Sequence, residues 1–442
     1  MKTTYHPYVL TVAIAFTFSL TGCGPADDSQ TPEGEATRPA EDSVLTVAAF
    51  REEAKNILRF WLDHGPEAEG DGFVGRIDYR GTPQPDADKA VILNSRILWT
   101  FAAAARRFEA PAYRAQADRA YRYFRQHFVD PEYGGVYWML DAQGQMKEGR
   151  KQVYAQSFGI YAFSEYYRLT GEAAALDEAI AIFELLETHA HDPEHGGYFD
   201  SFARDWQRLE TTYLGPDETK PAKTMNTHLH LLEAYTNLYR VWKDEGLAIR
   251  LEELINIHLD EMLNAENNHL YLFFTPDWQV LSEEISYGHD IEASWLLTEA
   301  AEVLGKEAVL AAVEAAAVPI AEATLQEGLD PDGGLLYEAD PHGYTDTDKS
   351  WWPQAEAVVG FYNAYQLSGE PRFREAAARS WAFTQEYLID REYGEWRIMV
   401  TREGDREAAA TSDKGGPWKA PYHNTRACLE MMRRLDDGKH HR

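Results

Sequence analysis

Basic residues are scarce in this chain of 442 residues, which holds 42 Lys and Arg against 73 Asp and Glu and has a formal charge of −31. Binding to a phosphate backbone needs a basic face, so the composition argues against a nucleic-acid partner. It argues equally against a broad electrostatic hold on anionic lipid. Aromatic and imidazole groups are abundant instead, with 12 Trp, 25 Tyr and 15 His. These side chains suit a neutral, polyhydroxylated ligand better than a charged polymer.

The apolar run at the N-terminus is short. It follows Lys2, extends from Tyr8 to Leu20 and is too short to span a bilayer comfortably, which indicates a secretory signal. The run ends in Leu20-Thr21-Gly22-Cys23, which resembles a bacterial lipobox. We therefore expect an exported lipoprotein on the periplasmic side of a bacterial membrane, with Cys23 lipidated. An ordinary signal peptide that happens to contain a cysteine is the alternative, and the small residues before Cys23 argue against it.

Cysteine is nearly absent, since Cys23 and Cys428 are the only two. With Cys23 lipidated, Cys428 has no partner, and we expect no disulfide although the protein is exported. Residues 24–43 contain almost no apolar side chains, which is typical of a flexible tether. The sequence thus predicts a signal peptide over 1–22, a tether over 23–43 and one catalytic domain over 44–435.

A short glycine–aromatic element recurs six times, in copies that lie 61 to 72 residues apart. A glycine pair permits a tight turn, and the aromatic and β-branched residues after it suit a short hairpin strand. A degenerate copy without glycine lies near Asn268, and the other five begin at Gly72, Gly134, Gly196, Gly333 and Gly394. The repetition indicates one architecture built from six similar units.

Pairs of segments rich in Ala, Leu and Glu, with apolar residues at helical spacing, lie between the copies. They predict helices over 44–62, 89–107, 112–127, 150–169, 173–189, 223–243, 245–264, 286–304, 306–324, 348–367, 370–386 and 419–435. An open solenoid would need polar capping repeats, whereas the last segment is as rich in functional side chains as the middle ones. We therefore predict an all-α fold, an (α/α)6 barrel in which six helical hairpins close into a toroid with short β-hairpins at one mouth.

Polar and aromatic residues that do not fit a plain core gather at the starts of alternate helices, which are the inner ones of a toroid. They lie in LNSRILWTF, RKQVYAQSF, KTMNTHLHLLEAYTNLYR, SYGHDIEASWLL, DKSWWPQAEAVVG and PWKAPYHNTRACLEMM. In this order the segments resemble the N-acylglucosamine 2-epimerase superfamily, and within it the cellobiose 2-epimerases. The resemblance runs from residue 50 to 435 and is most specific in SYGHDIEASW and WKAPYHNTRA. It implies an isomerase that inverts carbon 2 of the reducing-end sugar of a β-1,4-linked disaccharide such as cellobiose or mannobiose.

His289 and Glu292 stand three residues apart in SYGHDIEASW, on one face of a helix. We expect the carboxylate to orient the imidazole and to hold its proton ready. A satisfied core histidine is the alternative, and the specificity of the segment argues against it. A metal would need a second pair of ligands, as in di-iron helix bundles. We see no second pair, and the implied chemistry needs neither a metal nor a nucleotide, so we expect no cofactor.

The segment THLH holds two histidines for which we expect different roles. Residues two apart on a helix point to different sides, so His228 and His230 cannot bind one ion from that helix. Asn226 and His230 are four residues apart and face the same way. The resemblance places His230 in the pocket, where it assists the opening of the sugar ring. We expect His228 to be structural.

His423 follows a proline that marks a helix start, and a helix N-terminus lowers the pKa of an imidazole, which keeps it neutral and basic. Trp418, just before it, offers a stacking platform. Trp352 and Glu356, four residues apart, form a similar aromatic and carboxylate face. Core filling is the alternative for such tryptophans, and we accept it for Trp351. The resemblance favours sugar contacts for Trp352 and Trp418, and we expect Glu292 and Glu356 among the substrate-binding residues as well.

Arg96 lies in an apolar stretch, where a guanidinium is expensive to bury without a role. A salt bridge to a structural carboxylate is one account of it, and binding of a sugar oxygen that becomes an oxyanion is the other. The resemblance implies that His289 and His423 exchange protons with carbon 2 and that Arg96 stabilises the enediolate. It gives Asn226 and Tyr154 the task of positioning hydroxyl groups.

Three other functions compete on this sequence. An aldose–ketose isomerase shares the enediolate but returns the proton to carbon 1. A glycoside hydrolase needs two carboxylates across one bond, for which Glu292 and Glu356 are candidates, but it would leave the histidines unemployed. A sugar-binding lipoprotein without activity is the third. We expect a monomer that takes a disaccharide, binds no nucleic acid and meets the membrane only through its N-terminal lipid.

Overall fold

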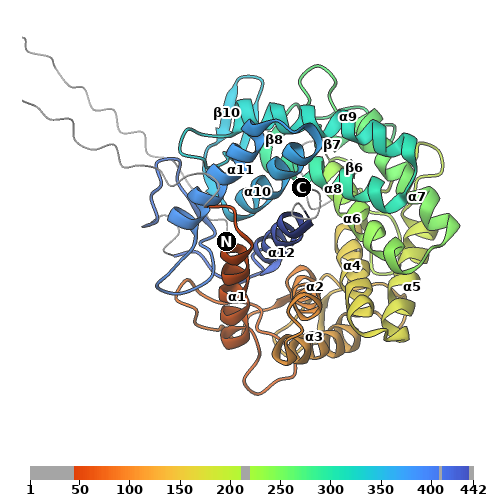
Figure 1. Ribbon diagram of the computed structural model, residues 1–442. Helices are drawn as coiled ribbons and strands as arrows, with labels where there is room; N and C mark the ends of the chain where they lie inside the picture. The colour runs from red at the N-terminus through yellow and green to blue at the C-terminus, as the bar shows by residue number, and fades with distance from the viewer. Residues whose placement is uncertain (1–43, 211–219, 408–410, 438–442) are drawn as a thin grey trace, which may run out of the picture. The chain divides into compact units, whose positions relative to one another are not determined.

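A computed structural model describes residues 44–210, 220–407 and 411–437 of the chain. The predicted signal peptide and tether, including Cys23, lie outside these residues. Within them, twelve α-helices follow one another around a ring, and the alternate helices line its inside (Figure 1). The predicted (α/α)6 barrel is confirmed.

The helices of the inner ring are α2 (Val91–Phe108), α4 (Val153–Thr170), α6 (Met225–Val241), α8 (Tyr287–Leu304), α10 (Trp351–Ser368) and α12 (Tyr422–Asp437). Those of the outer ring are α1 (Val47–His64), α3 (Pro111–Tyr123), α5 (Ala173–His189), α7 (Glu245–Ile257), α9 (Glu307–Ala323) and α11 (Pro371–Phe383). Four outer helices continue into a π-helical turn: η2 (Phe124–Phe128), η3 (His258–Met262), η4 (Thr324–Gly328) and η5 (Thr384–Leu388).

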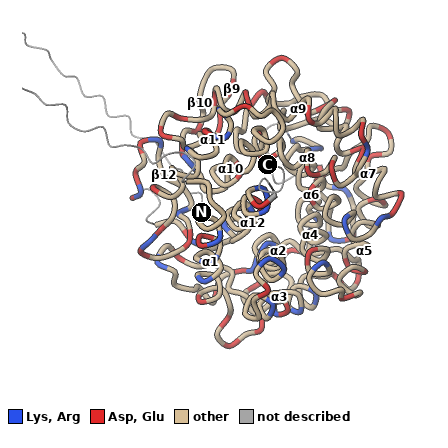
Figure 2. The backbone as a smooth tube through the Cα atoms, viewed as in Figure 1, with Lys and Arg blue, Asp and Glu red and all other residues tan. Residues whose placement is uncertain are grey.

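Burial separates the two rings. Every residue of α2 from Val91 to Ala105 is buried, whereas α3 buries only a stripe of four. On a helix that is covered on all sides, every side chain has to be apolar or have its polar groups hydrogen-bonded inside the protein. An outer helix needs only one apolar stripe. Asp and Glu are spread over the outer helices and the loops rather than gathered in one patch (Figure 2).

The repeated glycine elements form short antiparallel strand pairs next to the first turns of the inner helices. Their backbone carbonyls accept hydrogen bonds from the helix starts: Trp138 from the N–H of Val91, and Asp200 from the N–H of Val153. These bonds satisfy N–H groups that a helix start leaves without a partner. The strands are β1 (Lys89–Ala90), β2 (Met139–Leu140), β3 (Met146–Glu148), β4 (Lys151–Gln152), β5 (Ser201–Phe202), β6 (Lys223–Thr224), β7 (Phe273–Phe274), β8 (Ile285–Ser286), β9 (Glu338–Asp340), β10 (Gly343–Asp346), β11 (Lys349–Ser350) and β12 (Met399–Val400).

A buried lysine–aspartate pair recurs beside these strands. The Nζ atom lies 3.0 Å from a carboxylate oxygen in Lys151–Asp130, 2.7 Å in Lys223–Asp192, 2.8 Å in Lys349–Asp330 and 2.8 Å in Lys414–Asp390. The degenerate copy has Asn264 in place of the aspartate and Ile285 in place of the lysine that begins β4, β6 and β11. Both charges are lost together there, because either one alone would be buried without compensation.

The two ends of the described chain close the ring. α1 packs against α12, so the sixth helical pair joins the first helix to the last (Figure 1). Two indole hydrogen bonds also join α1 to the segment just before β12: Nε1 of Trp61 donates to Glu395 at 2.8 Å, and Nε1 of Trp396 donates to Glu53 at 2.8 Å. Closure therefore depends on buried hydrogen bonds between residues that are more than 300 positions apart.

Glu53 makes ring closure sensitive to pH. Burial raises the pKa of this carboxyl from 4.5 to about 7, although the hydrogen bond from Trp396 opposes the shift. As pH rises from 4.5 towards 7, the unfolded chain loses this proton while the folded chain keeps it, so this group's contribution to stability is lost over that range. We therefore expect the free energy of unfolding of Glu53→Gln, relative to that of the wild type, to be higher at pH ~8 than at pH ~5, as measured by urea unfolding. Glu52→Gln, which changes an exposed neighbour, is the control. If Glu53→Gln differs from the wild type by the same free energy at both pH values, the raised pKa of Glu53 is contradicted.

Candidate active site

Three histidines from three inner helices lie in one cluster near the helix N-termini. In each of them Nδ1 is engaged: His230 with Glu233 at 3.0 Å, His289 with Ser286 at 2.7 Å and His423 with Glu356 at 2.7 Å. No Nε2 atom of the three makes a hydrogen bond to any other residue that the structure describes. An imidazole that is held through one nitrogen can use the other for proton transfer.

The rings of the cluster are connected through aromatic contacts. The indole of Trp352 lies 4.7 Å from the ring of His289 and 5.6 Å from the ring of His423, measured between centroids. The phenol of Tyr154 meets His230 edge-on at 4.9 Å. Two of the histidines therefore contact the same indole, while the third lies against the tyrosine.

Burial keeps His289 and His423 neutral. It lowers the pKa of His289 to about 3, with a further contribution from His230. Burial also lowers the pKa of His423 well below its usual value, and the positive charges of Arg96 and Arg426 add to the effect. A low pKa of His423 was expected from the helix N-terminus; desolvation is the first cause of the shift, followed by the charges of Arg96 and Arg426.

Arg426 connects the histidines through a set of buried carboxylates. Its guanidinium binds Glu233 and Glu292 and lies 2.9 Å from Glu356, and the Tyr422 hydroxyl donates to Glu233 at 2.6 Å. Burial, followed by the charge of Glu356, raises the pKa of Glu292 to about 7. Burial acts in the same direction on Glu233, but Arg426 and His230 outweigh it and hold the pKa of Glu233 below its usual value.

The same carboxylates and histidines form two groups with the donor atoms of a metal site. These are His230, Glu233, Glu292 and Glu292, Glu356, His423, each with its ligand atoms within 4.8 Å of one another. The Arg426 guanidinium already binds all three carboxylates and supplies the positive charge that a metal ion would bring. The expectation of a site without metal stays a prediction.

Two sequence expectations about this cluster are wrong. Glu292 does not orient His289, because its Oε1 binds Arg426 and lies 3.8 Å from Nδ1 of His423, while Ser286 contacts His289. A second His-x-x-Glu pair does exist, since His230 and Glu233 are in contact. Glu233 and Arg426 were not among the predicted site residues, although both stand three residues after a histidine, as Glu292 does.

Arg96 has no carboxylate among its described partners. Its Nη2 donates to the Tyr154 hydroxyl at 2.8 Å, its Nη1 donates to the backbone carbonyl of Trp418 at 3.1 Å, and its guanidinium lies 4.5 Å from the Phe158 ring centre. The salt bridge considered for it is therefore not formed. A buried cation that is held only by neutral groups keeps its charge available to an oxyanion.

The remaining predicted residues divide between the cluster and its surroundings. Trp418 is 44% exposed, whereas Trp352 is 8% exposed and contacts the rings of His289 and His423. Asn226 is half-buried, and its Oδ1 has no hydrogen-bond partner among the described residues. His228 is fully buried: its Nδ1 donates to the Thr224 carbonyl at 2.7 Å, and its Nε2 accepts from the backbone N–H of Tyr198 at 2.9 Å. It is structural, as expected.

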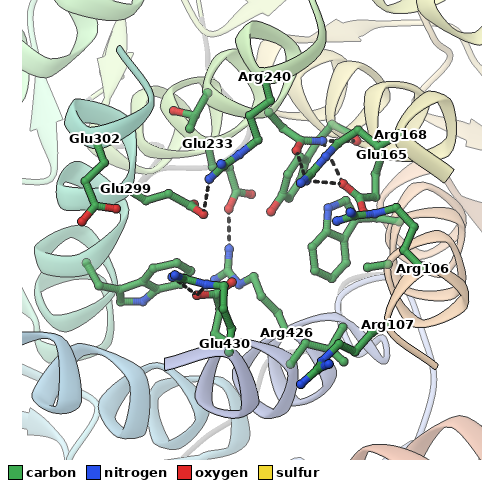
Figure 3. A pocket seen from close by; sticks show the side chains of 18 of the residues that line it. Arg106, Arg107, Glu165, Arg168, Glu233, Arg240, Glu299, Glu302, Arg426 and Glu430 are labelled. Carbon is green, nitrogen blue, oxygen red and sulfur yellow. Dashed lines mark hydrogen bonds and ion pairs between the residues drawn. The ribbon is translucent and has the colours of Figure 1, made fainter. Parts of the chain in front are cut away.

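A cavity of about 430 Å³ lies at the opposite end of the inner helices. Arginines and acidic residues alternate around it: Arg106 and Arg168 both bind Glu165 at 2.8 Å, and Arg240 binds Glu299 at 2.6 Å (Figure 3). Basic residues near helix C-termini are favourable because the helix dipole is negative there. Arg426 and Glu233 also line this cavity, so they separate it from the histidines.

Known proteins support the resemblance seen in the sequence. A family profile described as N-acylglucosamine 2-epimerase (GlcNAc 2-epimerase) matches residues 72–427. The chain belongs to this family. Within the family, the cellobiose 2-epimerase of Bacteroides fragilis is 42% identical over 392 residues, covering 88% of this chain and 99% of that protein. The cellobiose 2-epimerase of Ruminococcus albus is 38% identical over 392 residues, with the same coverage of 88% and 99%.

Solved structures agree with this assignment. The structure of cellobiose 2-epimerase from Bacillus thermoamylovorans B4167 has a TM-score of 0.83 and 40% identity, and the match covers 88% of this chain and 99% of that one. All the predicted catalytic and substrate-binding residues, from Arg96 to His423, fall inside the range that the family profile matches.

Removing the central arginine should destabilise the epimerase fold. Arg426→Leu leaves three buried carboxylates without their cation, so we expect the free energy of unfolding to fall by about 3–5 kcal/mol. Arg433→Leu, on the same helix but half exposed, should cost less than about 1 kcal/mol. Urea unfolding of both variants measures the difference. Equal losses in the two variants would show that Arg426 does not neutralise the carboxylates.

Proposed function

We propose that the chain catalyses reversible 2-epimerisation of the reducing-end sugar of a β-1,4-linked disaccharide, such as cellobiose or mannobiose. The observation that carries the proposal is the pair of neutral imidazoles, His289 and His423, whose ring centres lie 4.7 and 5.6 Å from that of Trp352 and whose Nε2 atoms make no hydrogen bond to any described residue. The relatives named cellobiose 2-epimerase support a disaccharide as the substrate. The proposal needs no cofactor.

The reaction starts with ring opening, because only the free aldehyde makes the hydrogen on carbon 2 acidic. His230, next to Tyr154, moves the proton that ring opening requires. One histidine of the pair then removes the proton from carbon 2, which gives a planar cis-enediolate. The other returns a proton to carbon 2 from the opposite face, and the aldehyde forms again with inverted configuration. The roles exchange in the reverse direction.

Neighbouring groups stabilise the intermediate and hold the sugar. The Arg96 guanidinium is available to the enediolate oxygen because no carboxylate neutralises it. Tyr154 and Asn226 position hydroxyl groups, and Trp352 and Trp418 contact the sugar rings. Glu292 and Glu356, which we expected among the substrate-binding residues, are buried and bind Arg426. Glu356 also holds Nδ1 of His423 and stabilises the imidazolium when it forms.

The competing functions fit these contacts less well. A glycoside hydrolase needs a carboxylic acid and a carboxylate on opposite sides of a bond. Glu292 and Glu356 instead bind the same guanidinium, and both are fully buried. An aldose–ketose isomerase would share every step up to the enediolate and differ in the carbon that receives the proton. Product analysis separates it from the epimerase.

Proton NMR of the reducing-end anomers, with cellobiose and then mannobiose as substrate, tests the proposed reaction. In deuterated water we expect deuterium at carbon 2 of the epimer, since two separate acids cannot conserve the original hydrogen. His289→Ala and His423→Ala should each lose roughly 10²–10⁴ in rate, and the double variant should lose little more. His228→Ala is the histidine control. Near wild-type epimerisation by both single variants, or product without deuterium, would refute the two-histidine mechanism.

We further propose that the protein is an exported lipoprotein, held on the periplasmic side of a bacterial membrane through Cys23. The short apolar run and the Leu20-Thr21-Gly22-Cys23 sequence support this. Expressed in a bacterium with labelled fatty acid, the wild type should incorporate label and sediment with membranes. Cys23→Ala should do neither, while Cys428→Ala should behave as the wild type. Membrane sedimentation of Cys23→Ala would contradict lipidation at this residue.

A further inference from the structure

Ser286 is the N-cap residue of α8, yet its side chain does not cap the helix. A serine or threonine at an N-cap normally accepts a hydrogen bond from an N–H of the first turn. Thr46 does so for α1, with Ala49 at 3.1 Å, and Thr224 does so for α6, with Thr227 at 3.2 Å. The Ser286 hydroxyl instead lies 2.7 Å from Nδ1 of His289.

Because Ser286 does not cap α8, the helix loses stability that the side chain could have supplied. A capping side chain contributes about 0.5–2 kcal/mol, and Ser286 forgoes this although it is only 2% exposed. The hydroxyl binds the imidazole of His289 instead. Among the described residues His289 has no carboxylate partner, whereas His230 and His423 each have one, so the Ser286 hydroxyl is the polar group that sets the rotation of the His289 ring.

The same ring packs against Trp352, and the local sequence makes room for this contact. Trp352 lies close to Gly288, where an added Cβ would stand 2.6 Å from the indole. Ser286 thus holds the ring at Nδ1, and Trp352 packs against it with 4.7 Å between ring centres and 51° between ring planes. Together they leave Nε2 as the ring nitrogen without a protein partner in the described chain.

We propose that Ser286 is a positioning residue for the epimerisation, one that fixes the orientation of His289 so that Nε2 reaches carbon 2. The inference rests on the proposed function. A hydroxyl can accept or donate, so it keeps contact with Nδ1 whichever nitrogen of the neutral ring carries the proton, and also when the ring is protonated. A carboxylate would favour the imidazolium. The hydroxyl therefore orients His289 without holding a proton on it.

Three variants test this role. Ser286→Ala should lower kcat by about tenfold or more, part of the 10²–10⁴ that a positioned acid–base group contributes, and leave KM within about twofold. Ser286→Thr keeps the hydroxyl at an N-cap position where the chain already uses Thr224, so it should restore most of the rate. Ser350→Ala is the matched control, because Ser350 is the N-cap of α10 and its hydroxyl bonds only the Ile398 carbonyl, at 3.3 Å.

Exchange in deuterated water distinguishes a positioning role from general damage. Ser286→Ala impairs one face of carbon 2, so the epimer whose hydrogen faces His423 should still take up deuterium while inversion is slow. Rates for Ser286→Ala that equal those of Ser350→Ala would overturn the proposal. So would equal losses of inversion and of exchange in both epimers. A wild type that neither inverts nor exchanges carbon 2 would instead refute the proposed function, with the Ser286 contact untouched.

Discussion

The charge balance around Arg426 is the constraint on which the rest of the site depends. Three carboxylates, Glu233, Glu292 and Glu356, are buried at the centre of the barrel, and one guanidinium binds them all. Without it their mutual repulsion and desolvation would be prohibitive. With it, two of them can hold the Nδ1 atoms of His230 and His423 while these histidines stay close to each other and to His289.

The two ends of the barrel differ in the groups that meet the ends of the inner helices, and this difference accommodates the buried charges. At the N-terminal end of the inner helices, strand carbonyls satisfy the first helical N–H groups, so side chains there are free for other tasks. At the C-terminal end, arginines face the negative ends of the helix dipoles and pair with acids around the cavity (Figure 3). Arg426 lies between the two ends: it lines the cavity and also binds the carboxylates next to the histidines.

The architecture could be predicted from the sequence because short local patterns mark each repeat. Glycine pairs mark the turns and helical spacing marks the helices, and both act over a few residues. The same signals led to the three histidines. Side-chain partners were harder to foresee: a spacing of three residues suggested that Glu292 serves His289, but on a helix it is equally consistent with a partner 134 residues away, which is Arg426. Whether Glu292 binds His289 or Arg426 depends on the packing between helices, and no local pattern in a single sequence shows it.

Pairing of the first helix with the last sets the order in which the barrel is completed during synthesis. Helical pairs in the middle of the chain can form as they emerge, because their contacts are close in sequence. The sixth pair cannot, since α1 has to wait for α12, and α12 carries both His423 and Arg426. Until that helix docks, α1 lacks its partner, the inner carboxylates lack their cation and the histidine pair is incomplete. A nascent chain therefore acquires its closed core and its proton-transfer groups in a single final event.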